Sequence, residues 1–339
     1  MVAEEFWKGK RVLVTGGAGF IGSYVVRRLL KHGAKLAVAD NFENGRLSNL
    51  AGVRKDVEVM EGDLRDPQFC LRACARKEVT LHLASKAYGL SYSYTHHGEM
   101  LADNLLINTN ILEACRKARV PRVLATSSSC VYPDDAAVPT PETQDISGSA
   151  PEQVNEGYGW AKRMLERQAV YYHREHDMEI AIARPFNAYG PRHRYDPARA
   201  HVLPSLVMRV LRGENPIVVW GSGNQTRSFV HAEDAATGLL LLAEKYACAD
   251  PVNVGHDREI TIRDLIALIL EISGEKREVV FDRTKPEGAM RKSCDPTKLK
   301  QVTGFVPATM LGDGLPATIQ YYEQELSRGG DKVTHDELS

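Results

Sequence analysis

Short apolar runs alternate with amphipathic stretches along the first half of the chain. The runs RVLVT, KLAVA, VEVM and VTLHL are rich in strand-forming residues. Between them, apolar residues recur at helical spacing up to about His32 and again near Phe69, which predicts helices. This alternation predicts a parallel sheet with helices packed against it.

The same rhythm continues to about Arg184. A long helix is predicted from about Glu99 to Ala118, and Pro121 ends it before the strand RVLATS. A further helix begins at Glu156 and precedes the strand EIAIAR. We therefore predict an α/β fold, with a doubly wound Rossmann sheet over residues 1–190.

The pattern changes after Pro191. A loop rich in Arg, His, Tyr and Pro precedes smaller units such as PIVVW and TIRDLIALILEI, which predict a smaller α/β substrate-binding domain, mainly over residues 191–327. The segment 229–255 contains VHAEDAATGLLLL and PVNVG and could return to the first sheet. The polar tail 328–339 has little to bury, so we expect it to be disordered.

The composition restricts the class of partner. The 339 residues are 43% hydrophobic, and the formal net charge of -1 gives no field that would attract nucleic acid or an anionic membrane. No apolar run reaches the roughly 18 to 20 residues that span a bilayer, so we expect a cytoplasmic protein that binds small molecules. Cys70 and Cys74 have helical spacing rather than a zinc-ligand pattern, and no metal site is expected.

A glycine-rich segment, TGGAGFIGS, joins the first strand to the first helix. Gly16, Gly19 and Gly22 would let backbone amides approach a pyrophosphate at the positive end of that helix, although a tight turn packed on a helix would need the same glycines. Asp40 ends the second strand, where a carboxylate accepts the ribose hydroxyls of NAD and repels the extra phosphate of NADP. Arg46 is the nearby residue that could favour NADP instead.

Two further segments, GDL and HLAS, follow the third and fourth strands at sheet ends that would face the same dinucleotide. The residues that we expect to contact NAD are Gly16, Gly19, Phe20, Ile21, Gly22, Asp40, Asn41, Asp63, Leu64, Ala84, Ser85, Asn104, Tyr158 and Lys162.

The segment YGWAK places Tyr158 and Lys162 four residues apart, on one face of a predicted helix. Tyrosine titrates near about pH 10, so it acts as a base at neutral pH only when a cation stabilises the phenolate, as Lys162 and a positive nicotinamide would. We predict that Ser128, in TSSSCVYP at the end of a strand, is the hydroxyl partner. Taken alone, such a Tyr and Lys are common on ordinary helices.

Together these segments resemble the extended short-chain dehydrogenase/reductase family, in particular its NAD-dependent sugar epimerases and dehydratases. The resemblance covers most of the chain and extends to RPFNAYGP, TRSFVHAED and PEGAMRKSCD. It implies a nucleotide-diphosphate sugar as substrate, with Asn187 and Arg227 near the pyrophosphate and Arg291 as a further phosphate contact. It also implies a homodimer formed through the long helices that begin near Glu99 and Gly157.

The residues after Ser128 bear on the reaction. Sugar 4,6-dehydratases of the family carry Asp and then Glu where this chain has Ser129 and Cys130, so water elimination is not expected. SSCVYP instead resembles a segment of GDP-mannose 3,5-epimerases and GDP-fucose synthases in which the cysteine is an acid/base residue.

The loop segment AHVLP adds a second likeness. In GDP-fucose synthases a histidine three residues before a proline is the other acid/base group, and His201 precedes Pro204 by three residues. GDP-mannose 3,5-epimerases have a lysine in this loop, and the sequence has none between Pro191 and Pro204. The resemblance therefore assigns the acid/base pair to Cys130 and His201.

We therefore expect an NAD-dependent epimerase that forms a transient 4-keto sugar and inverts carbon 3, carbon 5 or both through Cys130 and His201. Three alternatives stay open. A simple 4-epimerase would need the Ser, Tyr and Lys but not Cys130. An epimerase/reductase like GDP-fucose synthase would consume NADPH, which Asp40 disfavours. A non-catalytic dinucleotide sensor would have little reason to keep the Ser, Tyr and Lys together.

Overall fold

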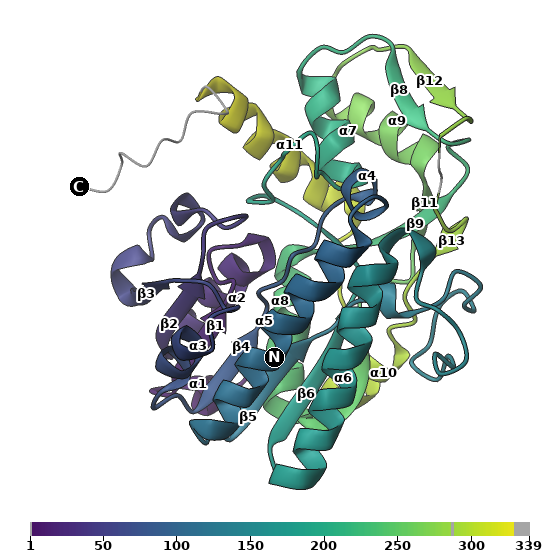
Figure 1. The fold of residues 1–339 in the computed structure, drawn as a ribbon. Helices are drawn as coiled ribbons and strands as arrows, with labels where there is room; N and C mark the ends of the chain where they lie inside the picture. Colours follow the sequence, from purple (N-terminus) through teal and green to yellow (C-terminus); the bar gives the residue numbers. More distant parts are fainter. Residues whose placement is uncertain (1, 286–287, 329–339) are drawn as a thin grey trace.

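The computed structural model describes residues 2–285 and 288–328, and a single parallel sheet forms its centre (Figure 1). This seven-stranded sheet has the order β10-β6-β5-β4-β1-β2-β3. Its strands are β1 (Arg11–Thr15), β2 (Lys35–Asp40), β3 (Val57–Glu61), β4 (Val79–His82), β5 (Arg122–Thr126), β6 (Glu179–Pro185) and β10 (Cys248–Val254).

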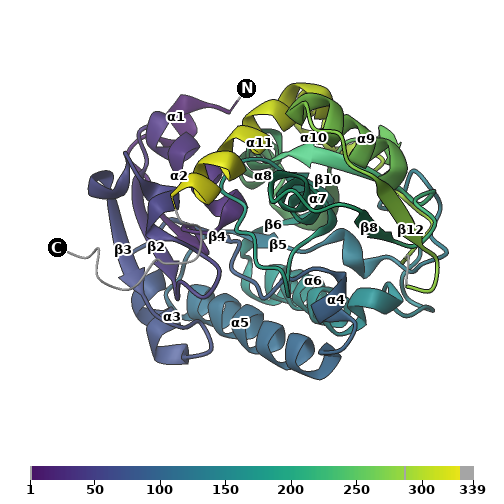
Figure 2. The ribbon, with the colours of Figure 1, turned by 90° about the horizontal axis from the view of Figure 1, so that it is seen from above.

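Helices cover both faces of this sheet, as the view from above shows (Figure 2). One face carries α1 (Glu4–Trp7), α2 (Phe20–Lys31), α8 (Ala232–Lys245) and α10 (Thr297–Thr303). The other face carries α3 (Pro67–Cys74), α5 (His97–Lys117) and α6 (Glu156–His176). The predicted doubly wound α/β fold is therefore confirmed.

The strands of the large sheet are continuous apolar runs because successive residues face opposite sides of the sheet, and both sides are buried. In β1, Val12 and Val14 join the core beneath α2 and α8, whereas Leu13 joins the core beneath α3, α5 and α6. Successive strand residues face opposite sides of the sheet, so a sheet buried on both faces needs apolar residues at every position.

The second half of the chain contributes to both parts of the molecule. Strand β10 pairs with β6 at the edge of the large sheet, and α8 packs against α2, so within the segment 229–255 these two elements lie with the first half of the chain. Of the tail 328–339, all but Arg328 lies outside the described residues. Within the described ranges, no helix combines the length and apolarity needed to cross a membrane.

A smaller part lies beyond the carboxyl ends of the large sheet (Figure 1). Its core lies between α7 (Val202–Leu211), α9 (Ile262–Ser273) and α11 (Leu311–Ser327). Its strands are β8 (Ile217–Trp220) with β12 (Val279–Asp282), and β9 (Thr226–His231) with β7 (Asn187–Tyr189), β11 (Glu259–Thr261) and β13 (Arg291–Lys292). The remaining short elements are α4 (Leu90–Ser93), η1 (Leu47–Leu50), η2 (Arg54–Asp56), η3 (Ser129–Val131) and η4 (Gln153–Asn155).

A buried ion pair joins α6 to the sheet. Glu166 on α6 accepts from Arg184 on β6 at 2.6 and 2.8 Å, and both side chains are almost fully buried. Ser127 donates to the same carboxylate at 2.5 Å, and Arg184 also donates to the hydroxyl of Tyr132 at 2.9 Å. Because Glu166 and Arg184 are each other's counter-charge, removal of either one would leave the other buried and unpaired.

We predict that Glu166→Ala lowers the free energy of unfolding by about 3–5 kcal/mol, because it leaves the guanidinium of Arg184 buried without its counter-charge. Urea unfolding followed by circular dichroism would measure this change. Glu175→Ala is the matched control, since Glu175 lies on the same helix with its side chain 64% exposed. A loss for Glu166→Ala no larger than that of the control would contradict the prediction.

Candidate active site

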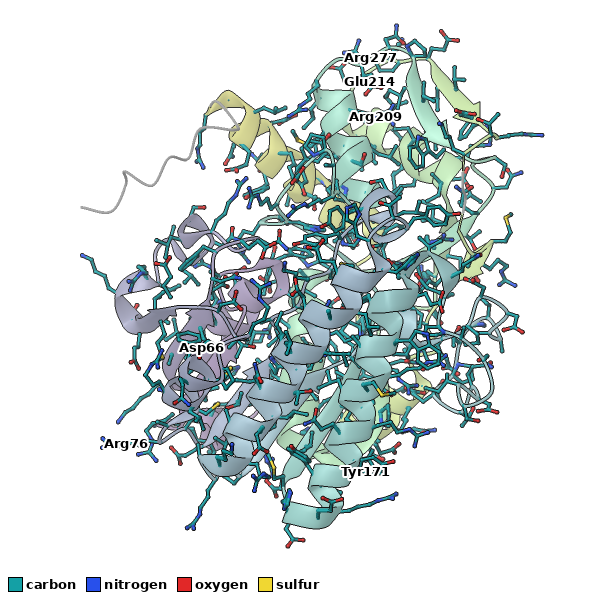
Figure 3. The ribbon with its side chains drawn as sticks, in the orientation of Figure 1. Asp66, Arg76, Tyr171, Arg209, Glu214 and Arg277 are labelled. Carbon is teal, nitrogen blue, oxygen red and sulfur yellow. The ribbon has the colours of Figure 1, made fainter. Side chains whose placement is uncertain are left out.

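A cleft of about 720 Å³ opens at the carboxyl ends of the parallel strands, between the large sheet and the smaller part. Its walls include the glycine loop after β1, the ends of β2, β4, β5 and β6, and the loop that leads into α7. Ligands bind at this edge in open α/β sheets, and the volume suits a small molecule. At the smaller part, Arg209 of α7 also lines the cleft, held by Glu214 at 2.6 and 2.5 Å (Figure 3).

The glycine loop has no room for side chains. Gly16 has a φ of +67°, and a Cβ there would lie 2.9 Å from the backbone of Ala84. A Cβ on Gly22 would overlap the carbonyl oxygen of Gly16. Gly19 immediately precedes α2, and Phe20 and Ile21 in its first turn also line the cleft. The positive end of α2 therefore faces the cleft, as a pyrophosphate requires.

Asp40 lies at the end of β2 and also lines the cleft. Its carboxylate accepts from the backbone amides of Ala18 and Phe42, both at 3.0 Å, while burial raises its pKa. Arg46, the cation that could favour NADP, instead pairs with Glu325 of α11 at 2.7 Å. A carboxylate fixed at this position fits the ribose hydroxyls of NAD.

The remaining residues expected to contact the dinucleotide divide into two groups. Those that line the cleft are Asn41, Asp63, Leu64, Ala84 and Ser85. Asn104, in contrast, is fully buried in α5 and is not among the described residues that line the cleft. Its side chain accepts from Ser85 at 2.9 Å and from the amide of Lys86 at 3.0 Å, and donates to two carbonyls. The expected direct contact of Asn104 is thus not supported: the side chain holds the turn that carries Ser85.

Ser128, Tyr158 and Lys162 lie around one end of the same cleft. The ammonium of Lys162 donates to the carbonyl of Thr126 at 2.8 Å and lies 5.5 Å from the centre of the Tyr158 ring. The hydroxyl oxygens of Tyr158 and Ser85 lie 3.5 Å apart. Burial lowers the pKa of Lys162 to about 7 and raises the pKa of Tyr158. The cleft therefore holds a phenol, a hydroxyl and an amine, the groups that proton transfer at a carbinol needs.

Cys130 and His201 line this cleft as well. Cys130 follows Ser128 in η3, and its amide donates to the Ser128 hydroxyl at 3.1 Å. Burial raises the pKa of the Cys130 thiol to about 11. His201 precedes α7 and is exposed to the cleft, with its ring 5.5 Å from that of His193. Desolvation of the imidazole at the cleft wall, with a smaller contribution from Lys292, lowers the pKa of His201 to about 4.

The residues expected at the pyrophosphate do not all reach the cleft. Asn187 and Arg227 line it, and Arg227 donates to the carbonyl of Ala289 at 2.7 Å. Arg291, however, pairs with Glu259 at 2.6 Å, is 57% exposed, and lies outside the cleft lining of the described chain. The contact expected for Arg291 is therefore not supported.

Sequence reasoning missed two residues of the site, Glu152 and Lys292. Lys292 lines the cleft because it follows Arg291 in β13, and adjacent residues of a strand face opposite sides. The motif PEGAMRKSCD contained the signal, but which of its two basic residues faces the cleft depends on the register of β13 on β9. Glu152 lies in an irregular segment that offers no periodic signal.

Reversible oxidation of a sugar hydroxyl needs a dinucleotide beside a proton acceptor, and this cleft joins a dinucleotide loop to a Ser, Tyr and Lys. These features define the class of Rossmann-fold, dinucleotide-dependent enzymes. Residues 12–255 match the NAD dependent epimerase/dehydratase family, and the chain belongs to that family. NAD is its cofactor, and the expected membership of the sugar epimerases and dehydratases is confirmed.

Relatives with named activities match nearly the whole chain. GDP-L-fucose synthase 1 of Arabidopsis thaliana is 32% identical, over 93% of this chain and 94% of the relative. GDP-mannose 3,5-epimerase 1 of Oryza sativa subsp. indica is 28% identical, over 96% of this chain and 85% of the relative. Among solved structures, UDP-glucose 4-epimerase of Thermotoga maritima with UDP-glucose has a TM-score of 0.84 at 31% identity, covering 93% of this chain and 99% of that one.

We predict that Gly22→Ala weakens NAD binding at least about tenfold, because the added methyl group displaces the carbonyl of Gly16 and with it the loop at the positive end of α2. Titration calorimetry with NAD would measure the effect. Gly312→Ala in α11 is the matched control, since a Cβ there meets nothing within 4 Å. NAD affinity unchanged in folded Gly22→Ala would show that the loop does not hold the dinucleotide.

Proposed function

We propose that this chain is a nucleotide-sugar epimerase that oxidises carbon 4 of the sugar transiently and inverts carbon 3, carbon 5 or both. The observation that carries the proposal is that Cys130 and His201 line the cleft that also holds Ser128, Tyr158 and Lys162. A simple 4-epimerase needs only the last three of these residues.

The substrate class that we propose is a GDP-sugar, in keeping with the names of the two relatives described above, a GDP-L-fucose synthase and a GDP-mannose 3,5-epimerase. Asn187 and Arg227 line the cleft away from the sheet, and we propose that they contact the diphosphate. The negative charge of a nucleotide diphosphate would offset the guanidinium of Arg227, whose burial lowers its own pKa.

The glycine loop and Asp40 would hold NAD, which would supply reversible hydride transfer at carbon 4. Lys162 stabilises the phenolate form of Tyr158. This phenolate takes the proton of the carbon 4 hydroxyl and becomes a phenol, while Ser128 holds the oxygen. The carbonyl so formed makes the protons on carbons 3 and 5 acidic enough for removal by a nearby base.

Inversion of a carbon centre then needs a proton acceptor on one face and a proton donor on the other. The lowered pKa of His201, about 4, makes it a neutral acceptor at pH 7. The raised pKa of Cys130, about 11, keeps it a thiol that can donate. Because the two side chains come from different elements, η3 and the residue before α7, they can approach a bound sugar from different sides.

Proton NMR in deuterated water, with GDP-mannose and other nucleotide sugars and no added reductant, would test this reaction. We expect deuterium at carbon 3 or carbon 5, and a loss of at least about 100-fold in its incorporation rate for Cys130→Ser and for His201→Asn. Cys248→Ser is the matched control, because Cys248 is exposed and is not among the described residues that line the cleft.

Other results would identify the alternatives. Inversion at carbon 4 without deuterium, unaffected by Cys130→Ser or His201→Asn, would establish a simple 4-epimerase. Net consumption of added NADPH would establish an epimerase/reductase, and absence of hydride exchange with any nucleotide sugar would favour a dinucleotide sensor.

We also infer that the protein forms a homodimer through α5 and α6, which lie side by side along one face (Figure 1). Leu106 on α5 is 49% exposed, and Met164 and Tyr171 on α6 are 44% and 51% exposed. Figure 3 shows Tyr171 pointing outward from α6. A second copy of this helix pair would cover these side chains.

Light scattering after size-exclusion chromatography would test the dimer. We expect the parent chain to have the mass of two chains, and Met164→Lys combined with Tyr171→Glu to have the mass of one, because the substitutions bury charges at the interface. Val280→Lys is the matched control, since Val280 is 39% exposed on β12, away from both helices. A parent chain with the mass of one chain would refute the dimer.

A further inference from the structure

An ion pair lies on the cleft wall beside Cys130. The ammonium of Lys292 contacts the carboxylate of Glu152, and their side chains are only 14% and 12% exposed. The side-chain amide of Asn155 donates a hydrogen bond to the same carboxylate. Two charges buried to this extent need each other, so the pair is fixed in place.

The free side of the ammonium faces sulfur. The Nζ of Lys292 lies 3.8 Å from the Sγ of Cys130, which is within hydrogen-bonding distance for a thiol. A positive charge this close favours the thiolate form of cysteine, whereas a carboxylate close by favours the thiol. Glu152 and Lys292 therefore act on the thiol in opposite directions.

We propose that Lys292 is a positioning residue that makes Cys130 a usable proton donor, and that Glu152 holds Lys292 and limits its effect. In the donating step the S–H bond breaks and a C–H bond forms on the sugar. The electron pair stays on sulfur, where the ammonium of Lys292 stabilises it, and water restores the proton afterwards. The catalytic part of this inference rests on the proposed function, but the ionisation of Cys130 can be measured without any sugar.

Other groups also face Cys130. Tyr158 and Lys162 approach it from α6, and the hydroxyl of Ser128 bonds its amide. Burial is the largest cause of the raised pKa of Cys130, Glu152 raises it further, and Lys292 lowers it. Changes at Glu152 and Lys292 leave the groups on α6 in place, so they isolate the contribution of the ion pair.

The test is the rate of alkylation by iodoacetamide between about pH 6.5 and pH 10, measured on the NAD-bound protein by mass spectrometry of each cysteine. Cys248 is exposed and serves as the reference within the same molecule. We expect Lys292→Met to raise the apparent pKa of Cys130 and slow its alkylation about tenfold at pH 8, and Glu152→Gln to lower the pKa and speed alkylation.

Two further variants separate charge from structure. Lys292→Arg keeps the positive charge, so alkylation of Cys130 should stay close to the parent rate. Lys300→Met removes an exposed lysine on α10 and should leave Cys130 unchanged. Alkylation profiles of Cys130 that shift in the same direction in Lys292→Met and Glu152→Gln, or that do not shift relative to Cys248, would overturn the inference.

Failure of this inference is distinguishable from failure of the proposed function. Shifted alkylation profiles without deuterium incorporation would show that the ion pair sets the ionisation of Cys130, and that the proposed epimerisation is wrong. Deuterium incorporation that depends on Cys130, with unshifted profiles, would keep the epimerase and refute the role of Lys292.

Discussion

The charged side chains that α6 directs into the sheet determine where the reacting groups lie. Lys162 donates to the carbonyl of Thr126, and Arg163 donates to the carbonyl of Val131 at 2.8 Å. One turn later Glu166 binds Arg184 on β6. These contacts hold the helix that carries Tyr158 against the turn that carries Ser128 and Cys130. Because Glu166 and Arg184 are buried together, α6 cannot slide along the sheet without leaving these two charges unpaired.

The second half of the chain completes the site around this fixed centre. Lys292 on β13 lies opposite Arg227 on β9, so two cations from neighbouring strands border the same cleft. Glu152 approaches both, which reduces the repulsion between them. Lys292 also lowers the pKa of His201, so one ammonium acts on both proposed acid/base residues. The electrostatic state of the sugar end therefore depends on elements that are far apart in sequence.

Local motifs were enough to predict the fold and much of the site. The glycine loop, Asp40 and the Tyr158–Lys162 spacing depend on contacts within one strand–turn–helix unit or one helix, which sequence reveals. Asn104, Arg291 and Lys292 depend on long-range packing instead. Asn104 is at the same helical spacing whether it faces NAD or a turn, and the choice between Arg291 and Lys292 depends on how β13 pairs with β9. The partner of Arg46 lies in α11, beyond the reach of any local pattern.

The two ends of the cleft bear on the proposed reaction in different ways. At the end that we propose holds the sugar, Cys130 and His201 line the cleft, and the resemblance to GDP-fucose synthases implies that they are an acid/base pair; a chain of that name is 32% identical to this one. At the coenzyme end, Asp40 is held by two backbone amides and Arg46 is occupied by Glu325, so the site offers a negative charge where NADPH carries a phosphate. An enzyme that returns its hydride to the same sugar needs no external reductant. The combination of this acid/base pair with an NAD site is therefore consistent with epimerisation without net reduction.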